Sequence, residues 1–141
     1  MSEKREAIVK EFLSAWGDGN RKFPDKERIL SLMTPDAEWT LWVGGDDNVR
    51  RGHEAISAEI DREAPMMEFL HCRIRSIASN GTTVFTERTD KFVCMGKPVT
   101  FDLVAVFDFD ADDRISAWRE YFDSASVAQS MGMELEQINA Q

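Results

Sequence analysis

The sequence predicts an α+β domain in which helices precede a curved, mainly antiparallel sheet. Apolar residues recur at helical spacing in the first part of the chain, and apolar and polar residues alternate along much of the rest. Asn80-Gly81 separates two alternating segments, which is a strong signal for a β-hairpin. The 141 residues contain no repeat and no linker, so we expect a single domain over residues 1–141.

Three helices are expected in the N-terminal half. The first ends at Gly17-Asp-Gly-Asn, and the second begins near Pro24 and ends at Thr34-Pro35. The third runs from about His53 to Arg62. The apolar residues on their inner faces are Ile8, Phe12, Leu13 and Trp16, then Ile29, Leu32 and Met33, then Ala55, Ile56 and Ile60.

Strands make up most of the remainder. A short strand is expected from Ala37 to Trp42, followed by a glycine-rich loop from Val43 to Arg51. Four longer strands then alternate with turns, and a polar, loosely helical segment closes the chain from Ser124 to Ile138. The four strands are expected over residues 69–77, 82–94, 99–109 and 114–123.

The most informative residues are charged side chains on the apolar faces of two strands. Successive side chains of a strand alternate, so Arg88 and Asp90 share a face, and Glu120 lies between Trp118 and Phe122. Buried charges are costly unless they are paired. We therefore interpret Arg88, Asp90 and Glu120 as a catalytic group, with a structural salt-bridge network as the alternative.

Composition limits the partners of the chain. The net charge of −9 argues against nucleic acid, and no apolar run has the length of a membrane span. Cys72 and Cys94 do not suggest a disulfide framework, which favours a cytoplasmic location. His53 and His71 do not stand at metal-ligand spacing, so we expect no metal and no other cofactor.

Two motifs, Thr86-Glu-Arg-Thr-Asp90 and Trp118-Arg-Glu-Tyr-Phe-Asp123, resemble the paired signatures of the limonene-1,2-epoxide hydrolase family. That family lies within the nuclear transport factor 2-like (SnoaL-like) superfamily. The resemblance implies a cone-shaped sheet that wraps with its helices around an apolar pocket, and an enzyme that adds water to an apolar epoxide. Carried over by motif, Asp90 is the acid, Glu120 activates the water, and Arg88 orders both carboxyls.

This chain departs from the family pattern at three positions. Glu120 stands where the family has an aspartate, and Trp39 and Leu41 stand where the family has a tyrosine and an asparagine that hold the attacking water. The tryptophan side chain can donate a hydrogen bond but cannot accept one, and the leucine side chain can neither donate nor accept. The residues expected to line the substrate pocket are Trp39, Leu41, Phe92, Phe101, Leu103, Trp118 and Phe122.

Two other functions remain open from the sequence. An acid beside a base can also move a proton next to a carbonyl, as isomerases and cyclases of the same superfamily do. A carrier or sensor of small apolar molecules is the third reading. On the outer face of the sheet, Val104, Val106 and Tyr121 form an apolar strip, which predicts a homodimer packed sheet to sheet.

Overall fold

A computed structural model describes residues 2–41 and 48–132 of the chain. Helices and strands follow in the order α1 (Ser2–Trp16), α2 (Lys26–Ser31), β1 (Met33–Thr40), β2 (Val49–Arg51), α3 (Gly52–Glu63), a 3-10 turn (Ala64–Met66), β3 (Glu68–Ser79), β4 (Thr83–Cys94), β5 (Lys97–Phe109), β6 (Ile115–Tyr121) and α4 (Ser124–Ser130). The predicted α+β class is confirmed. In this part of the chain no helix is both long and apolar enough to cross a bilayer.

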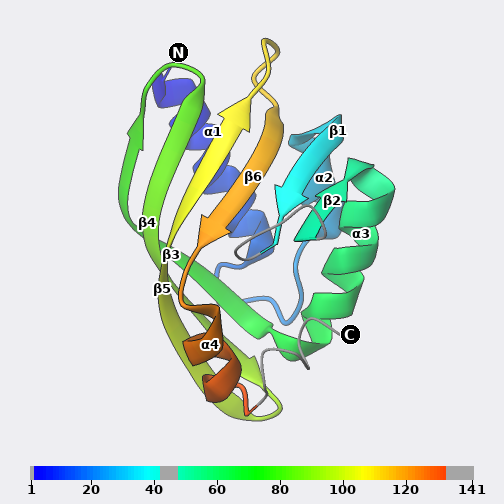
Figure 1. Cartoon of the computed structure of the whole chain (residues 1–141), viewed down its shortest axis with the longest axis vertical. Coiled ribbons are helices and arrows are strands. Elements are labelled where there is room, and N and C mark those ends of the chain that lie inside the picture. Colours follow the sequence, from blue (N-terminus) through cyan, green and yellow to red (C-terminus); the bar gives the residue numbers. More distant parts are fainter. Residues whose placement is uncertain (1, 42–47, 133–141) are drawn as a thin grey trace.

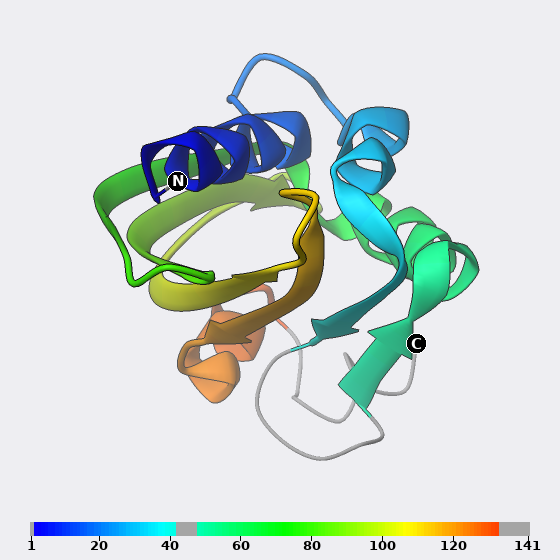
Figure 2. The same cartoon turned by 90° about the horizontal axis from the view of Figure 1, so that it is seen from above.

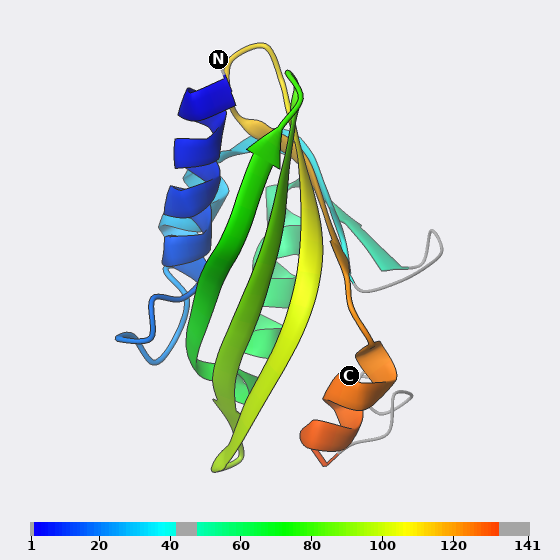
Figure 3. The same cartoon turned by 90° about the vertical axis from the view of Figure 1, so that its left-hand side faces the viewer.

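The six strands form one mixed sheet in the order β2-β1-β6-β5-β4-β3 (Figure 1). Strands β3 to β6 pair with their neighbours in antiparallel fashion, whereas β1 lies parallel to β6. Seen from above, the sheet is strongly curved, and α1 and α3 lie along its inner side (Figure 2). The long strands β3, β4 and β5 extend beyond α1 toward α4 (Figure 3).

The second helix and the strand after it differ from the prediction. Asp25 caps α2, where its carboxylate accepts a hydrogen bond from the Arg28 backbone N–H at 3.2 Å. The helix ends at Ser31, and Met33 already belongs to β1, so the prediction that Met33 lies in the helix was wrong. Pairing with β6 overrides the helical pattern here, because Met33 lies opposite Ile115.

The short strand β2 was missed by the sequence reading, which assigned Val43 to Arg51 to a loop. Val49–Arg51 instead pairs with β1, with Glu38 opposite Arg51. Three residues are too short to show an alternating pattern. Trp42 and residues 43–47 of the predicted loop lie outside the described residues, as do residues 133–138 of the predicted C-terminal segment.

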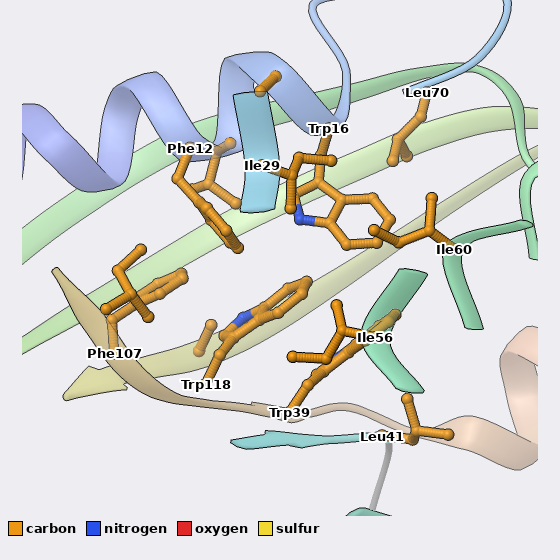
Figure 4. Close-up of a cluster of buried hydrophobic side chains, with 14 of the residues drawn as sticks. Phe12, Trp16, Ile29, Trp39, Leu41, Ile56, Ile60, Leu70, Phe107 and Trp118 are labelled. Carbon is orange, nitrogen blue, oxygen red and sulfur yellow. The ribbon is translucent and has the colours of Figure 1, made fainter. Parts of the chain in front are cut away.

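A cluster of aromatic side chains fills the space between α1 and the sheet (Figure 4). Trp39 from β1 stacks on Trp118 from β6 with ring centroids 4.9 Å apart. Phe12 from α1 meets Trp118 edge to face at 5.1 Å, and Trp16 lies 5.2 Å from Trp39. Aromatic pairs in such geometries contribute about 0.5–1.5 kcal/mol beyond their burial. These contacts fix the two strands that bring Trp39 and Glu120 toward one cavity.

The loop after α1 pairs with the edge of the sheet. The Gly19 backbone N–H donates to the Leu70 carbonyl at 3.0 Å, and the Cys72 N–H donates to the Gly17 carbonyl at 3.0 Å. A side chain at Gly17 is impossible without movement, because its Cβ would lie 2.0 Å from the Leu70 carbonyl oxygen. This close approach holds β3 where Leu70 and Cys72 reach the cavity.

Candidate active site

Strand β4 carries Arg88 and Asp90 on its inner face. The strand alternates buried and more exposed residues, and Arg88 and Asp90 are 2 % and 3 % exposed. The guanidinium binds the carboxylate through two hydrogen bonds, from Nε to Oδ1 at 2.8 Å and from Nη2 to Oδ2 at 3.1 Å. Such a bidentate pair fixes the orientation of both groups.

Glu120 reaches the same guanidinium from strand β6. Nη2 of Arg88 donates to Oε2 of Glu120 as well as to Asp90. Strand β5 lies between β4 and β6, and its residue opposite Glu120 is Ala105. Because alanine has only a methyl group, the arginine can extend across β5 to the glutamate. The structure thus brings together the three residues of the predicted catalytic group.

The electrostatics of the group are those of two carboxyls that compete for one cation. Burial raises the pKa of Glu120, and the Asp90 charge raises it further, although Arg88 opposes both effects. Burial acts against the charge of Arg88, but the carboxylates of Glu120 and Asp90 outweigh it and hold the arginine pKa above its ordinary value. A proton on one carboxyl leaves the group neutral, which suits a buried site.

A largely apolar cavity of about 80 Å³ adjoins these three residues. Six of the seven residues predicted to line a pocket do line it: Trp39, Leu41, Phe92, Phe101, Trp118 and Phe122. Leu103 is buried but is not among the lining residues. It lies opposite Arg88 in the pairing of β4 with β5.

Three polar lining residues were not predicted. Cys72 on β3 lies opposite Asp90 in the strand pairing, and burial raises the pKa of its thiol well above the ordinary value. Arg62 and Glu63 come from the end of α3. Glu63 follows Ile56 and Ile60 at helical spacing on the inner face, and that pattern could have revealed it.

In residues 2–41 and 48–132 no three His, Cys, Asp or Glu side chains cluster so as to hold a metal ion. The polar groups of the cavity are instead two carboxyls on one guanidinium, together with the residues at the end of α3. Such a set can deliver a proton at one point and accept one nearby.

A curved six-stranded sheet with helices on its inner side and an apolar cavity with buried ionisable groups define a cone fold of the nuclear transport factor 2-like type. The SnoaL-like domain model matches residues 9–118, and the chain belongs to that family. Within it, 51 residues are 43% identical to epoxide hydrolase EphG of Mycobacterium tuberculosis (strain ATCC 25618 / H37Rv). This match spans 36% of the chain and about a third (34%) of the relative, and it supports the predicted resemblance to limonene-epoxide-hydrolase-like proteins.

Solved structures share the whole fold at low sequence identity. An LEH-like epoxide hydrolase from M. tuberculosis has a TM-score of 0.74 at 24% identity, with 99% of this chain and 97% of that chain covered. SalBIII, an epoxide hydrolase/cyclase-like enzyme in pyran ring formation in the polyether salinomycin, has a TM-score of 0.72 at 19% identity. That match covers 86% of this chain and 92% of the SalBIII chain. At these identities the likeness establishes the predicted cone fold alone.

Proposed function

We propose that this protein is a cofactor-independent epoxide hydrolase that adds water to an apolar, cyclic or terpene-like epoxide and releases a vicinal diol. The observation that carries the proposal is the pair of inward carboxyls, Asp90 and Glu120, held by Arg88 in the wall of an apolar cavity. The family membership and the match to EphG support the same class of reaction.

The chemistry needs one proton donor and one proton acceptor at the same time. One carboxyl gives its proton to the epoxide oxygen while a carbon–oxygen bond of the ring breaks. A water oxygen forms the new bond to that carbon and loses a proton to the other carboxylate. The product carries two hydroxyls, and the proton returns to the first carboxyl through the shared guanidinium site or solvent, so the atoms and charges balance.

The two carboxyls can divide these roles in either order. The resemblance gives Asp90 the acid role and Glu120 the base role. The raised pKa of Glu120 and the bidentate hold of Arg88 on Asp90 favour the reverse order in the ligand-free protein. Because the two carboxyls interact through one guanidinium, they titrate as a coupled pair that shares one proton. We therefore expect two apparent pKa values in the pH–rate profile.

The size of the cavity constrains the ligand. A dry cavity of about 150 Å³ holds benzene, whereas this one has about 80 Å³. A terpene-sized epoxide therefore requires side chains of the wall to move. Met66, Met67 and Met131 line the cavity, and methionine is the apolar side chain that adapts most easily.

A second candidate function is proton transfer on an apolar ketone, or cyclisation of an epoxide by a hydroxyl of the same molecule. It is favoured by Trp39 and Leu41, which line the cavity where the family has water-holding polar residues. A reaction without external water needs no such residues. A non-catalytic carrier is the remaining alternative, since it would use the same cavity.

The test is incubation with cyclic and terpene epoxides in oxygen-18 water, followed by mass spectrometry of the products. Labelled diol from the wild type, and a loss of roughly 10²–10⁴-fold in Asp90→Asn and in Glu120→Gln, is the expected result. Arg119→Gln is the matched control, because Arg119 neighbours Glu120 in sequence but binds Asp108 at 2.7 Å. Full turnover in both acid variants would refute the assignment, and unlabelled cyclic ether from an epoxide that also carries a hydroxyl would favour the cyclase.

A further inference from the structure

The end of helix α3 provides a second polar wall of the cavity, on a different element from Asp90 and Glu120. Arg62 and Glu63 both line the cavity, with side chains 21 % and 13 % exposed, and their charged groups lie 3.7 Å apart. The charge of Glu120 acts on Glu63, which places the two carboxyls within electrostatic range of each other. A ligand in the cavity therefore meets ionisable groups from the sheet and from the helix.

Arg62 has a carboxylate partner besides Glu63. Glu59, one helical turn earlier and 3 % exposed, already accepts a hydrogen bond from Nε of Arg62 at 3.0 Å and from Nε of Arg50 at 3.2 Å. A second ionisable carboxyl beside this ion pair, in the wall of the cavity, suggests a ligand-binding role.

The hydrogen-bonding capacity of Glu63 indicates what it could bind. Burial raises the pKa of Glu63 well above its ordinary value, and the hydrogen bond with Glu59 raises it further. Although burial raises the pKa of Glu59 as well, hydrogen bonds from Glu63 and Arg62 hold it below its ordinary value. A protonated Glu63 that donates to Glu59 still presents a carbonyl oxygen that accepts, beside the Arg62 guanidinium that donates.

We propose that Arg62 and Glu63 form a hydroxyl-binding subsite, so that the natural ligand carries an alcohol in addition to the group that reacts at Arg88. An alcohol is the simplest group that can donate to Glu63 and accept from Arg62 at once, whereas an ether or ketone only accepts. The inference rests on the proposed function and narrows its substrate class to hydroxy-epoxides. Glu63 would then determine specificity without taking part in bond breaking.

The experiment measures binding of unreactive ligands by the fluorescence of the tryptophans that line the cavity, Trp16, Trp39 and Trp118. The probes are cyclohexanol and its methyl ether, which keeps the accepting oxygen and loses the donated proton. The wild type should bind the alcohol roughly tenfold more tightly, which corresponds to one hydrogen bond in a buried site. In Glu63→Met the preference should disappear, and in Glu54→Met, on the exposed side of the same helix, it should remain.

Three results would overturn the inference. The first is equal affinity of the wild type for both probes, a result that can be obtained even if the variants do not fold. The second is a preference that survives in Glu63→Met but disappears in Asp90→Asn, because the alcohol would then bind at Arg88. The third is a change of thermal stability in Glu63→Met with an unchanged preference. Neither probe reacts, so a failure of the hydrolase proposal leaves this test intact.

Discussion

Removal of the guanidinium of Arg88 should be the most damaging single change to the charged group. In Arg88→Gln, Asp90 and Glu120 would remain buried with no cation between them, at side-chain exposures of 4 % and 15 %. Loss of one partner of a buried ion pair costs about 3–5 kcal/mol. For a chain of this length we expect a fall in the melting temperature of roughly 10–15 °C.

The loss of stability in Arg88→Gln should depend on pH, because Arg88 is the group that lowers the pKa of Glu120. Without it, the folded-state pKa of this carboxyl rises further above the ordinary value of 4.5. When folding raises the pKa of a carboxyl, the free energy of unfolding of the protein falls as the pH rises from the unfolded-state pKa to the folded-state pKa. The free energy of unfolding of the variant should therefore lie furthest below wild type at pH 8 and recover toward pH 5.

The assay is urea unfolding followed by tryptophan fluorescence at pH 5 and pH 8, for wild type, Arg88→Gln and Arg119→Gln. The Arg119 guanidinium binds Asp108 at 2.7 Å on the outer face, with side chains 32 % and 36 % exposed. This exposed pair should contribute only about 0–1 kcal/mol. A deficit in Arg88→Gln as small as that of Arg119→Gln, or one that does not change with pH, would refute the reasoning.

Three further predictions concern the core, the helix and the outer face. Trp118→Ala should lower the free energy of unfolding by about 3–5 kcal/mol in urea unfolding, because the cavity left at a buried site relaxes only in part. As the pH rises from 5 to 8, the free energy of unfolding of Glu63→Gln should increase relative to that of the wild type, because the variant lacks a carboxyl whose pKa is raised by folding. A difference in free energy that stays constant with pH would contradict this. Val104 and Tyr121 are exposed and paired on β5 and β6, so we propose a dimer through this strip. Light scattering should give twice 16.1 kDa for wild type and the monomer mass for Val104→Lys, and a monomeric wild type would end the dimer proposal.

Much of the fold could be predicted because its signals are local. The alternation along β4 and the hairpin at Asn80-Gly81 specify their strands within the sequence itself. The position of Met33 could not be predicted, because β1 forms there by pairing with a strand about eighty residues later. Its helical spacing is a local signal that this distant partner overrides.

The candidate site shows the same division. Arg88, Asp90 and Glu120 could be grouped because each is a charge at an apolar position of a strand. Glu63 was missed although it continues the spacing of Ile56 and Ile60 on α3, because spacing places it on the inner face but does not show that this position borders a cavity. The inclusion of Leu103 failed because one face of a strand contains both cavity wall and packed core.

The parallel pairing of β1 with β6 has a consequence for the growing chain. Trp118 and Glu120 both lie on β6, which docks between β1 and β5. Until β6 has been synthesised and has docked, Trp39 lacks the ring on which it stacks, and Arg88 lacks its second carboxyl partner. Closing so long a loop is slow and comes late in folding. A nascent or partly unfolded chain therefore lacks the cavity, and the ligand that we propose for it would stabilise only molecules that have finished folding.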